Sequence, residues 1–233
     1  MIKKRSAPMN DAAAHLQGVD FMGPLLLLVW GCALGALLWG SGVDVLIQEW
    51  LFAHYVQGFN TAMRVLGEIG KGTAQMAACF VIAAVWVFLS WRRGGKLMQR
   101  GVWLVLAAVP VFAAAGLVNL LMKWSIGRGR PKEFLLNGGN PYEMHPFVGS
   151  AKWWSFPSGH SCSTFAIVVW LGLAFPRWRY PLWIAGAVLS FSRFLAVTPH
   201  FAGDVVAGAG VGAAVAWALW IARDKWLRGG ARG

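Results

Sequence analysis

Three polar motifs interrupt the second half of the sequence, and each lies at the end of a long apolar run. They read Lys123-Trp-Ser-Ile-Gly-Arg-Gly-Arg-Pro131, then Ser155-Phe-Pro-Ser-Gly-His160, then Ser192-Arg193 with His200-Phe-Ala-Gly-Asp204. Together they supply cations, two histidines and one carboxylate. Because the apolar runs approach the length that crosses a bilayer, the pattern predicts a phosphate-handling site at a membrane surface.

The composition around these motifs is that of a membrane protein. Of the 233 residues, 58% are hydrophobic and only 13% are charged, whereas soluble domains carry about 25% charged residues. The three cysteines have neither paired spacing nor a metal-ligand pattern, so we interpret them as small apolar helix residues. The composition therefore predicts a single all-α bundle that crosses the membrane several times.

Six apolar runs are predicted to form transmembrane helices, and together residues 21–222 form one domain. The spans are residues 21–40, 73–91, 101–122, 157–175, 182–198 and 201–222. The first lacks a small-residue cleavage pattern and is expected to be retained. Residues 43–72 carry apolar residues at mixed helical spacings, interrupted by charges, which indicates an interfacial helical segment. Residues 1–20 and 223–233 are tails, and residues 123–156 form a polar outer loop.

The basic residues predict the orientation of this bundle. With six spans, both tails, the 92–100 loop and the 176–181 turn lie on one side, and they hold thirteen of the 21 Lys and Arg residues. The positive-inside rule places that side in the cytoplasm, so the three motifs are expected to face outward. This distribution accounts for most of the net charge of +12 without nucleic acid as a partner.

The outer loop departs from this charge rule, because it carries a basic cluster on the side where the rule disfavours one. The cluster consists of Lys123, Arg128, Arg130, Lys132 and Lys152. We interpret it as a group that binds an anion, and a solvated loop near anionic headgroups is the alternative. Lys123 and Arg130 combine a point charge with a rigid donor fork that fits phosphate oxygens, although interfacial snorkelling would also place them there.

The second motif has the features of an anion-binding helix start. Ser158 is a predicted N-cap, and Gly159 has no side chain to block a close approach. The free N–H groups of the first turn and the helix dipole favour an anion. His160 lies in that turn and can donate or accept a proton. A simply capped helix with a spare histidine is the alternative.

The third motif pairs a histidine with a carboxylate. His200 and Asp204 share a helix face if the last helix begins at or before His200. Asp204 would then hold one ring nitrogen and leave the other free to act as a nucleophile. A buried structural ion pair is the alternative. Arg193 lies inside the fifth predicted span near its outer end, where an ionisable residue is a functional candidate.

The order and spacing of the motifs resemble those of the type 2 phosphatidic acid phosphatase superfamily, which also resembles the vanadium haloperoxidases. The family pattern is K-x6-R-P, then P-S-G-H, then S-R-x5-H-x3-D. The first two motifs match in full and the third matches in residue type. Six residues, not five, separate Arg193 from His200, and Pro199 in this gap is expected to absorb the extra residue in a bulged turn.

The resemblance implies a lipid phosphate phosphatase that works without a metal or another cofactor. His200, oriented by Asp204, would attack phosphorus, and His160 would protonate the leaving oxygen and later activate water against a phosphohistidine. The residues expected to bind the phosphate oxygens are Lys123, Arg130, Ser158, Gly159 and Arg193.

The same resemblance suggests bacterial substrates in the inner membrane, reached from the periplasm or exterior. The candidates are undecaprenyl diphosphate, lipid A, phosphatidylglycerol phosphate and phosphatidic acid, and the residues do not choose among them. A lipid-to-lipid phosphotransferase using the same site is one alternative. A non-catalytic anion-binding or lipid-binding transporter is another, although no strong internal repeat supports it. A haloperoxidase-like oxidant is disfavoured because the chain is membrane-embedded.

Overall fold

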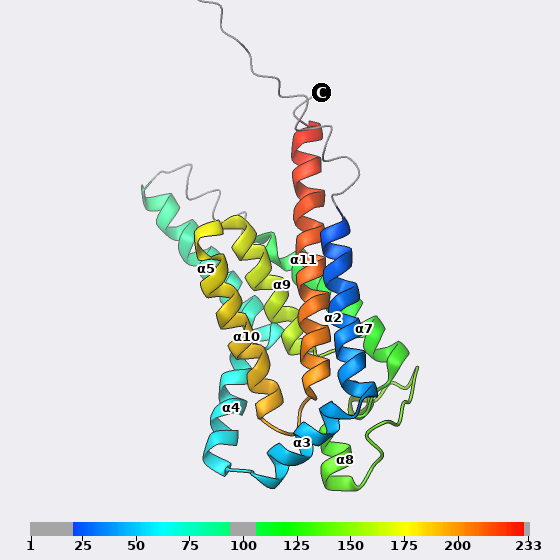
Figure 1. Cartoon of the computed structure of the whole chain (residues 1–233). Coiled ribbons are helices and arrows are strands. Elements are labelled where there is room, and N and C mark those ends of the chain that lie inside the picture. Colours follow the sequence, from blue (N-terminus) through cyan, green and yellow to red (C-terminus); the bar gives the residue numbers. More distant parts are fainter. Residues whose placement is uncertain (1–20, 94–105, 231–233) are drawn as a thin grey trace, which may run out of the picture.

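The computed structural model describes residues 21–93 and 106–230, and in this part of the chain six long helices run side by side (Figure 1). They are α2 (Met22–Gly40), α5 (Gly72–Arg93), α7 (Ala108–Ile126), α9 (Gly159–Ala174), α10 (Arg179–Leu195) and α11 (Ala202–Gly230). Shorter elements are α3 (Val43–Ala53), α4 (Gln57–Ile69), α8 (Pro131–Asn137), η1 (Ala151–Trp153) and η2 (Pro176–Trp178). The prediction of an all-α bundle is confirmed.

Four of the helices are long and apolar enough to cross a membrane. They are α2, residues Gly72–Leu89 of α5, α7, and residues Ala202–Lys225 of α11. α9 is apolar but has 16 residues, and α10 has 17. The six-span topology therefore stays a prediction. The N-terminal tail and most of the 92–100 loop lie outside the described residues, as does the predicted start of the third span.

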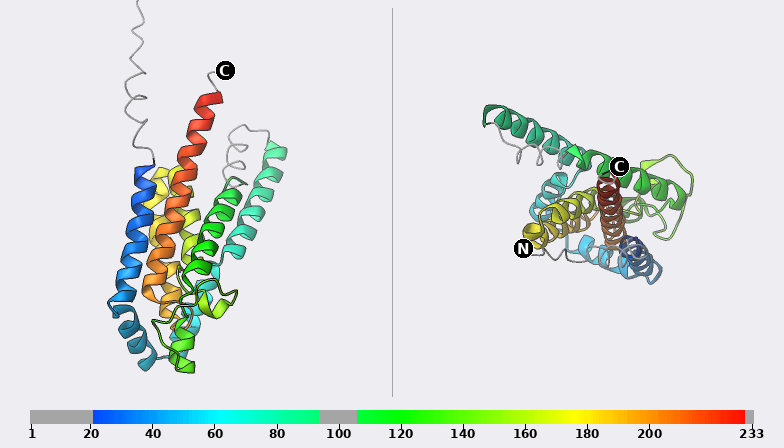
Figure 2. Two further views of the ribbon diagram at one scale, coloured as in Figure 1. Left: turned by 90° about the vertical axis from the view of Figure 1, so that its right-hand side faces the viewer. Right: turned by 90° about the horizontal axis from the view of Figure 1, so that it is seen from above.

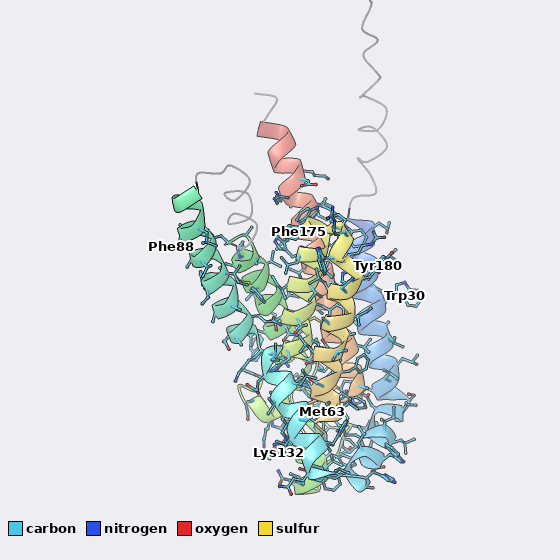
Figure 3. All side chains as sticks on the ribbon, turned by 90° about the vertical axis from the view of Figure 1, so that its left-hand side faces the viewer. Trp30, Met63, Phe88, Lys132, Phe175 and Tyr180 are labelled. Carbon is cyan, nitrogen blue, oxygen red and sulfur yellow. The ribbon has the colours of Figure 1, made fainter. Side chains whose placement is uncertain are left out.

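The outer surface of the bundle is apolar, as contact with lipid requires. Trp30 on α2 is 69% exposed, and Ile184 on α10 is 65% exposed. Trp30 and Phe88 project outward from the ribbons of α2 and α5 (Figure 3). A soluble monomer rarely exposes apolar side chains on this scale, so the arrangement supports membrane insertion.

Small residues allow α11 to pack closely against its neighbours α2 and α9 (Figure 2). A Cβ atom on Gly31 of α2 would lie only 2.8 Å from the Cα atom of Gly210. A Cβ atom on Gly212 would lie 2.0 Å from the carbonyl oxygen of Cys162 on α9. Such close backbone contact is typical of membrane helices with small residues at their interfaces.

All three motifs lie at one end of the bundle, at the ends of α7 and α10 and the starts of α9 and α11 (Figure 1). α2 begins and α11 ends at the opposite end of the bundle. Residues 43–72, for which the sequence predicts one interfacial segment, form the two short helices α3 and α4 at the motif end. α11 continues to Gly230, beyond the expected end of the last span at residue 222.

The outer loop of residues 123–156 is folded back on itself. It contains α8 and η1, and a β-bridge joins Arg128 to Met144. The backbone N–H of His145 donates to the carbonyl of Gly127 at 2.8 Å, and that of Ser155 donates to the carbonyl of Arg128 at 3.0 Å. These hydrogen bonds fix the path of the chain between the first and second motifs.

Candidate active site

The first and second motifs meet where α7 ends and α9 begins. Lys123 is buried, and its Nζ donates to the carbonyl oxygens of Trp154 and Ser155 at 2.6 and 3.2 Å. The side chain of Asn119, one turn earlier on α7, donates to the carbonyl of Pro157 at 3.3 Å. A Cβ atom on Gly159 would lie 3.8 Å from Cε of Lys123. The end of α7 therefore positions the backbone of the second motif.

The second motif also contacts the start of α11. Ser158 is fully buried, and its backbone N–H donates to the carbonyl of Asp204 at 2.8 Å. Its hydroxyl accepts a long, 3.5 Å hydrogen bond from the N–H of Ser161, which confirms the predicted N-cap. A Cβ atom on Gly208 would lie 2.3 Å from the carbonyl oxygen of Ser158, so this contact requires glycine on α11.

His200 and Asp204 are brought together at the start of α11. Nδ1 of His200 lies 3.5 Å from Oδ2 of Asp204, close enough for electrostatic attraction but without the geometry of a hydrogen bond. The helix begins only at Ala202, later than a shared helix face requires. Instead, Asp204 turns back and accepts a hydrogen bond from the N–H of Phe201 at 2.9 Å, as the acidic residue of a capping box does.

The surroundings of His200 favour its neutral form. The residue is almost fully buried, and burial lowers the pKa of its imidazole to about 4, although Asp204 opposes this shift. A neutral imidazole can act as a nucleophile, whereas a protonated one cannot. At neutral pH the side chain therefore has the protonation state that a nucleophile requires.

Arg128 holds the Asp204 carboxylate from the other side, a role that the sequence analysis did not predict. Its Nη1 lies 2.8 Å from Oδ1 of Asp204 and 2.9 Å from Oδ2 of Asp44, and all three side chains are fully buried. The guanidinium group is stacked against the rings of Phe201 and Trp39, with centroid distances of 4.0 and 4.5 Å. The anions that Arg128 binds are therefore carboxylates of the protein itself.

Two further polar contacts complete this buried network. The hydroxyl of Ser155 donates to Oδ2 of Asp204 at 2.5 Å, and the N–H of Gly203 donates to Oδ1 of Asp44 at 2.8 Å. Asp44 was not a predicted site residue. The available signal was a carboxylate directly after the first apolar run, at a depth where ionisable groups need a partner.

Arg130, Arg193 and His160 lie in the same region. Nε of Arg130 donates to the carbonyl of Ala151 at 2.9 Å, and Nη1 of Arg193 lies 3.4 Å from Oε1 of Glu68. His160 lies in the first turn of α9. Nε2 of His160 is buried and has no hydrogen-bond partner among the described residues. The structure thus gathers all eight predicted site residues at one end of the bundle.

The extra residue between Arg193 and His200 is accommodated in a turn. α10 ends at Leu195, and Val197 adopts a left-handed conformation with φ 68°, which a β-branched residue rarely does. The side chain of Gln48 on α3 donates a hydrogen bond to the carbonyl of Val197. The irregular residue is thus Val197, whereas the sequence pattern assigned the bulge to Pro199.

A cavity of about 280 Å³ opens beside Arg193. Its lining residues come from α4 and from the end of α10 with the turn that follows, and they are Arg64, Val65, Glu68, Arg193, Thr198 and Pro199. Across residues 21–93 and 106–230, no three His, Cys, Asp or Glu side chains are grouped so that they could hold a metal ion.

The sequence of the chain is similar to those of known proteins. The family model described as the PAP2 superfamily matches residues 102–228. A lipid A 1-phosphatase of Rhizobium etli is 30% identical over 160 residues, which cover 65% of this chain and 67% of the relative. A lipid A 1-phosphatase of Rhizobium johnstonii is 31% identical over 157 residues, covering 64% and 63%. The matched part is thus about two thirds of each relative.

A solved structure has the same fold. It is the crystal structure of a transmembrane PAP2 type phosphatidylglycerolphosphate phosphatase from Bacillus subtilis, with a TM-score of 0.63. The match covers 87% of this chain and 96% of that one, at 20% sequence identity. At this identity the likeness concerns the fold alone, because one fold can serve several activities.

Proposed function

The chain belongs to the PAP2 superfamily and is a membrane phosphatase of that type, and from this premise we propose that it removes a phosphate group from a lipid through a phosphohistidine intermediate. The observation that best supports the proposal is the arrangement of four residues. His200 lies next to Asp204, the backbone N–H of Ser158 donates to the carbonyl of Asp204, and Lys123 is buried in the same region. A nucleophile, its orienting carboxylate and a helix start suited to anions then surround one position.

In the proposed reaction, Nε2 of His200 attacks phosphorus while Asp204 holds the opposite side of the ring. The N–P bond forms as the bond from phosphorus to the lipid oxygen breaks, and His160 donates a proton to that oxygen. His160 then accepts a proton from water, which attacks the phosphohistidine, so that inorganic phosphate leaves and His200 is restored. Charged donors placed around the phosphoryl group stabilise its transition state.

The cations of the site supply this stabilisation without a metal. Lys123, Arg130 and Arg193 would bind the equatorial oxygens, together with Ser158 and the N–H of Gly159. In the structure the three cationic side chains bind carbonyl oxygens or a carboxylate of the protein. A phosphate dianion is a stronger acceptor than a carbonyl, so it can compete with the carbonyl partners for these donors.

The substrate that the comparisons favour is a glycolipid whose phosphate is attached to a sugar, because two relatives are lipid A 1-phosphatases. We place the enzyme in a bacterial inner membrane with six spans, both termini in the cytoplasm and the site facing outward. Undecaprenyl diphosphate, phosphatidylglycerol phosphate and phosphatidic acid remain the other members of the substrate panel.

The decisive experiment measures phosphate release from these four lipids by purified protein in detergent, with His200→Ala as the control. We expect release from lipid A, lowered about a thousandfold or more in the variant because the nucleophile is missing. EDTA should leave the rate unchanged and vanadate should inhibit. Activity in His200→Ala would exclude the proposed nucleophile, and sensitivity to EDTA would indicate a metal mechanism.

The phosphotransferase alternative is tested in the same assay. If the phosphoryl group passes to a second lipid, phosphorylated lipid product will appear in place of inorganic phosphate when an acceptor lipid is added. A transporter would release no phosphate under either condition.

A further inference from the structure

The cavity beside Arg193 has walls that both donate and accept hydrogen bonds. Arg64 on α4 uses Nε to donate to Oδ1 of Asn60 at 3.0 Å and Nη2 to donate to the hydroxyl of Thr198 at 2.9 Å. These two bonds hold the guanidinium group beside the turn that precedes His200. Its Nη1 has no role in either bond, so it can donate to a group in the cavity.

Glu68 gives the same cavity an acceptor. Its Oε1 lies 3.4 Å from Nη1 of Arg193, and its Oε2 lies 3.1 Å from Nζ of Lys71. The side chain of Glu68 is 56% exposed, and exposed ion pairs of this kind contribute little to stability. Glu68 can therefore exchange Arg193 for a hydroxyl group of a ligand without a large loss of stability.

The combination of a cationic donor, Arg64, and an anionic acceptor, Glu68, in the cavity lining discriminates between kinds of headgroup. A second phosphate would be attracted by Arg64 but repelled by the Glu68 carboxylate. Hydroxyl groups both donate and accept hydrogen bonds, so they can satisfy both residues at once. The volume of about 280 Å³ is near the lower end of ligand pockets, roughly 300 Å³, and it suits one ring-sized group. Val65 and Pro199 add apolar surface for the carbon face of such a ring.

We propose that this cavity binds the sugar ring that carries the scissile phosphate, and that Arg64 and Glu68 determine the preference for a sugar-linked phosphate over one attached directly to diacylglycerol. This inference rests on the proposed function, because it places the phosphate itself on Arg193 next to His200. It assigns to α4, which carries none of the three motifs, a direct part in choosing the substrate.

The test compares kcat/KM for two lipids, lipid A with its 1-phosphate and phosphatidic acid, whose phosphate is attached directly to diacylglycerol. In Arg64→Gln the ratio of the lipid A value to the phosphatidic acid value should fall about tenfold, because a charged hydrogen bond to the sugar is lost. The change should lie mainly in KM. Arg64→Lys, which keeps the charge but loses the fork, should fall between wild type and Arg64→Gln.

The control variant is Arg177→Gln, which makes the same substitution at an exposed arginine in η2, away from the cavity. Its ratio should equal that of wild type. An equal fall for both lipids in Arg64→Gln would overturn the inference, since Arg64 would then act only through Thr198 on the turn before His200. Hydrolysis of phosphatidic acid but not of lipid A by the wild-type protein would also overturn the inference, but it would be consistent with the proposed phosphatase function. Absence of phosphate release from both lipids would overturn the inference, and absence of release from all four lipids of the panel would overturn the proposed function as well.

Discussion

Arg128 lies only five residues from Lys123 and two from Arg130, yet its role is different. Lys123 and Arg130 donate to backbone carbonyls that a phosphate can replace, whereas Arg128 is fully buried between Asp44 and Asp204. Taking three charges out of water is costly unless they compensate one another. The network therefore serves to hold Asp204 in one position beside His200.

This arrangement predicts the effect of removing the central cation. Arg128→Met should lower the free energy of unfolding by about 3–5 kcal/mol, because two buried carboxylates lose their partner. Adding Asp44→Asn should restore part of that loss, since one of the unpaired charges is then removed. Thermal unfolding in detergent, followed by tryptophan fluorescence, measures both effects. An Arg128→Met variant as stable as wild type would show that the network is not needed to hold Asp204.

Among the helices, α11 combines close packing with a predicted site residue. Its glycines let it approach α2 and α9 at backbone distance, and its first turn carries Asp204. Gly208 links the packing of α11 to the position of the second motif, because it faces the carbonyl of Ser158. The position of the second motif relative to His200 therefore depends on a residue that carries no functional group.

The expected result of Gly208→Ala follows from that contact. A methyl group 2.3 Å from a backbone oxygen must displace α9 or α11, and overpacking of this kind costs about 1–3 kcal/mol. Phosphatase activity should fall as well, because Ser158 moves away from Asp204.

Gly116→Ala on α7 is the matched control, since a Cβ atom there would meet nothing within 4 Å. Its stability and activity should stay at the wild-type level or rise slightly. Thermal unfolding and phosphate release, measured on both variants, separate tight packing from a general intolerance of alanine. Equal behaviour of the two variants would contradict the proposed role of Gly208.

At the scale of the whole molecule, the bundle has two different ends. The three motifs, α3, α4 and α8 form one end, and the start of α2 and the end of α11 form the other (Figure 1). In Figure 3, Met63 on α4 and Lys132 on α8 mark the motif end, and Phe175 and Tyr180 mark the opposite end. We propose that the end with the start of α2 and the end of α11 faces the cytoplasm, as the positive-inside rule predicts.

Reporter fusions test this topology. We expect green fluorescent protein to fluoresce when joined after Gly233 or after Trp178, and alkaline phosphatase to be active when joined after Asn140. The junction after Trp178 is the critical one, because α9 and α10 are shorter than the four helices with full spanning length. Alkaline phosphatase activity at Trp178 would show that α9 does not cross the membrane and would exclude the six-span arrangement.

The sequence by itself determined the class of the molecule and predicted the residues of its site. Apolar runs predict membrane helices from composition and length alone, and the three motifs supply chemical groups whose order and spacing are visible without coordinates. The structure gathers all of these groups at one end. Their functional roles stay predictions until the variants are assayed.

Only the tertiary structure decided which other residues hold the three motifs in place at one end of the bundle. Arg128 pairs with Asp44 across 84 positions of sequence, and Asp44 pairs with Gly203 across 159. Arg64 reaches Thr198 across 134 positions. No local pattern encodes such pairs, because helix packing sets the distance between them. Helix packing also explains the position of the bend before His200. The bend lies at Val197, whose carbonyl accepts a hydrogen bond from Gln48 on α3, and not at Pro199.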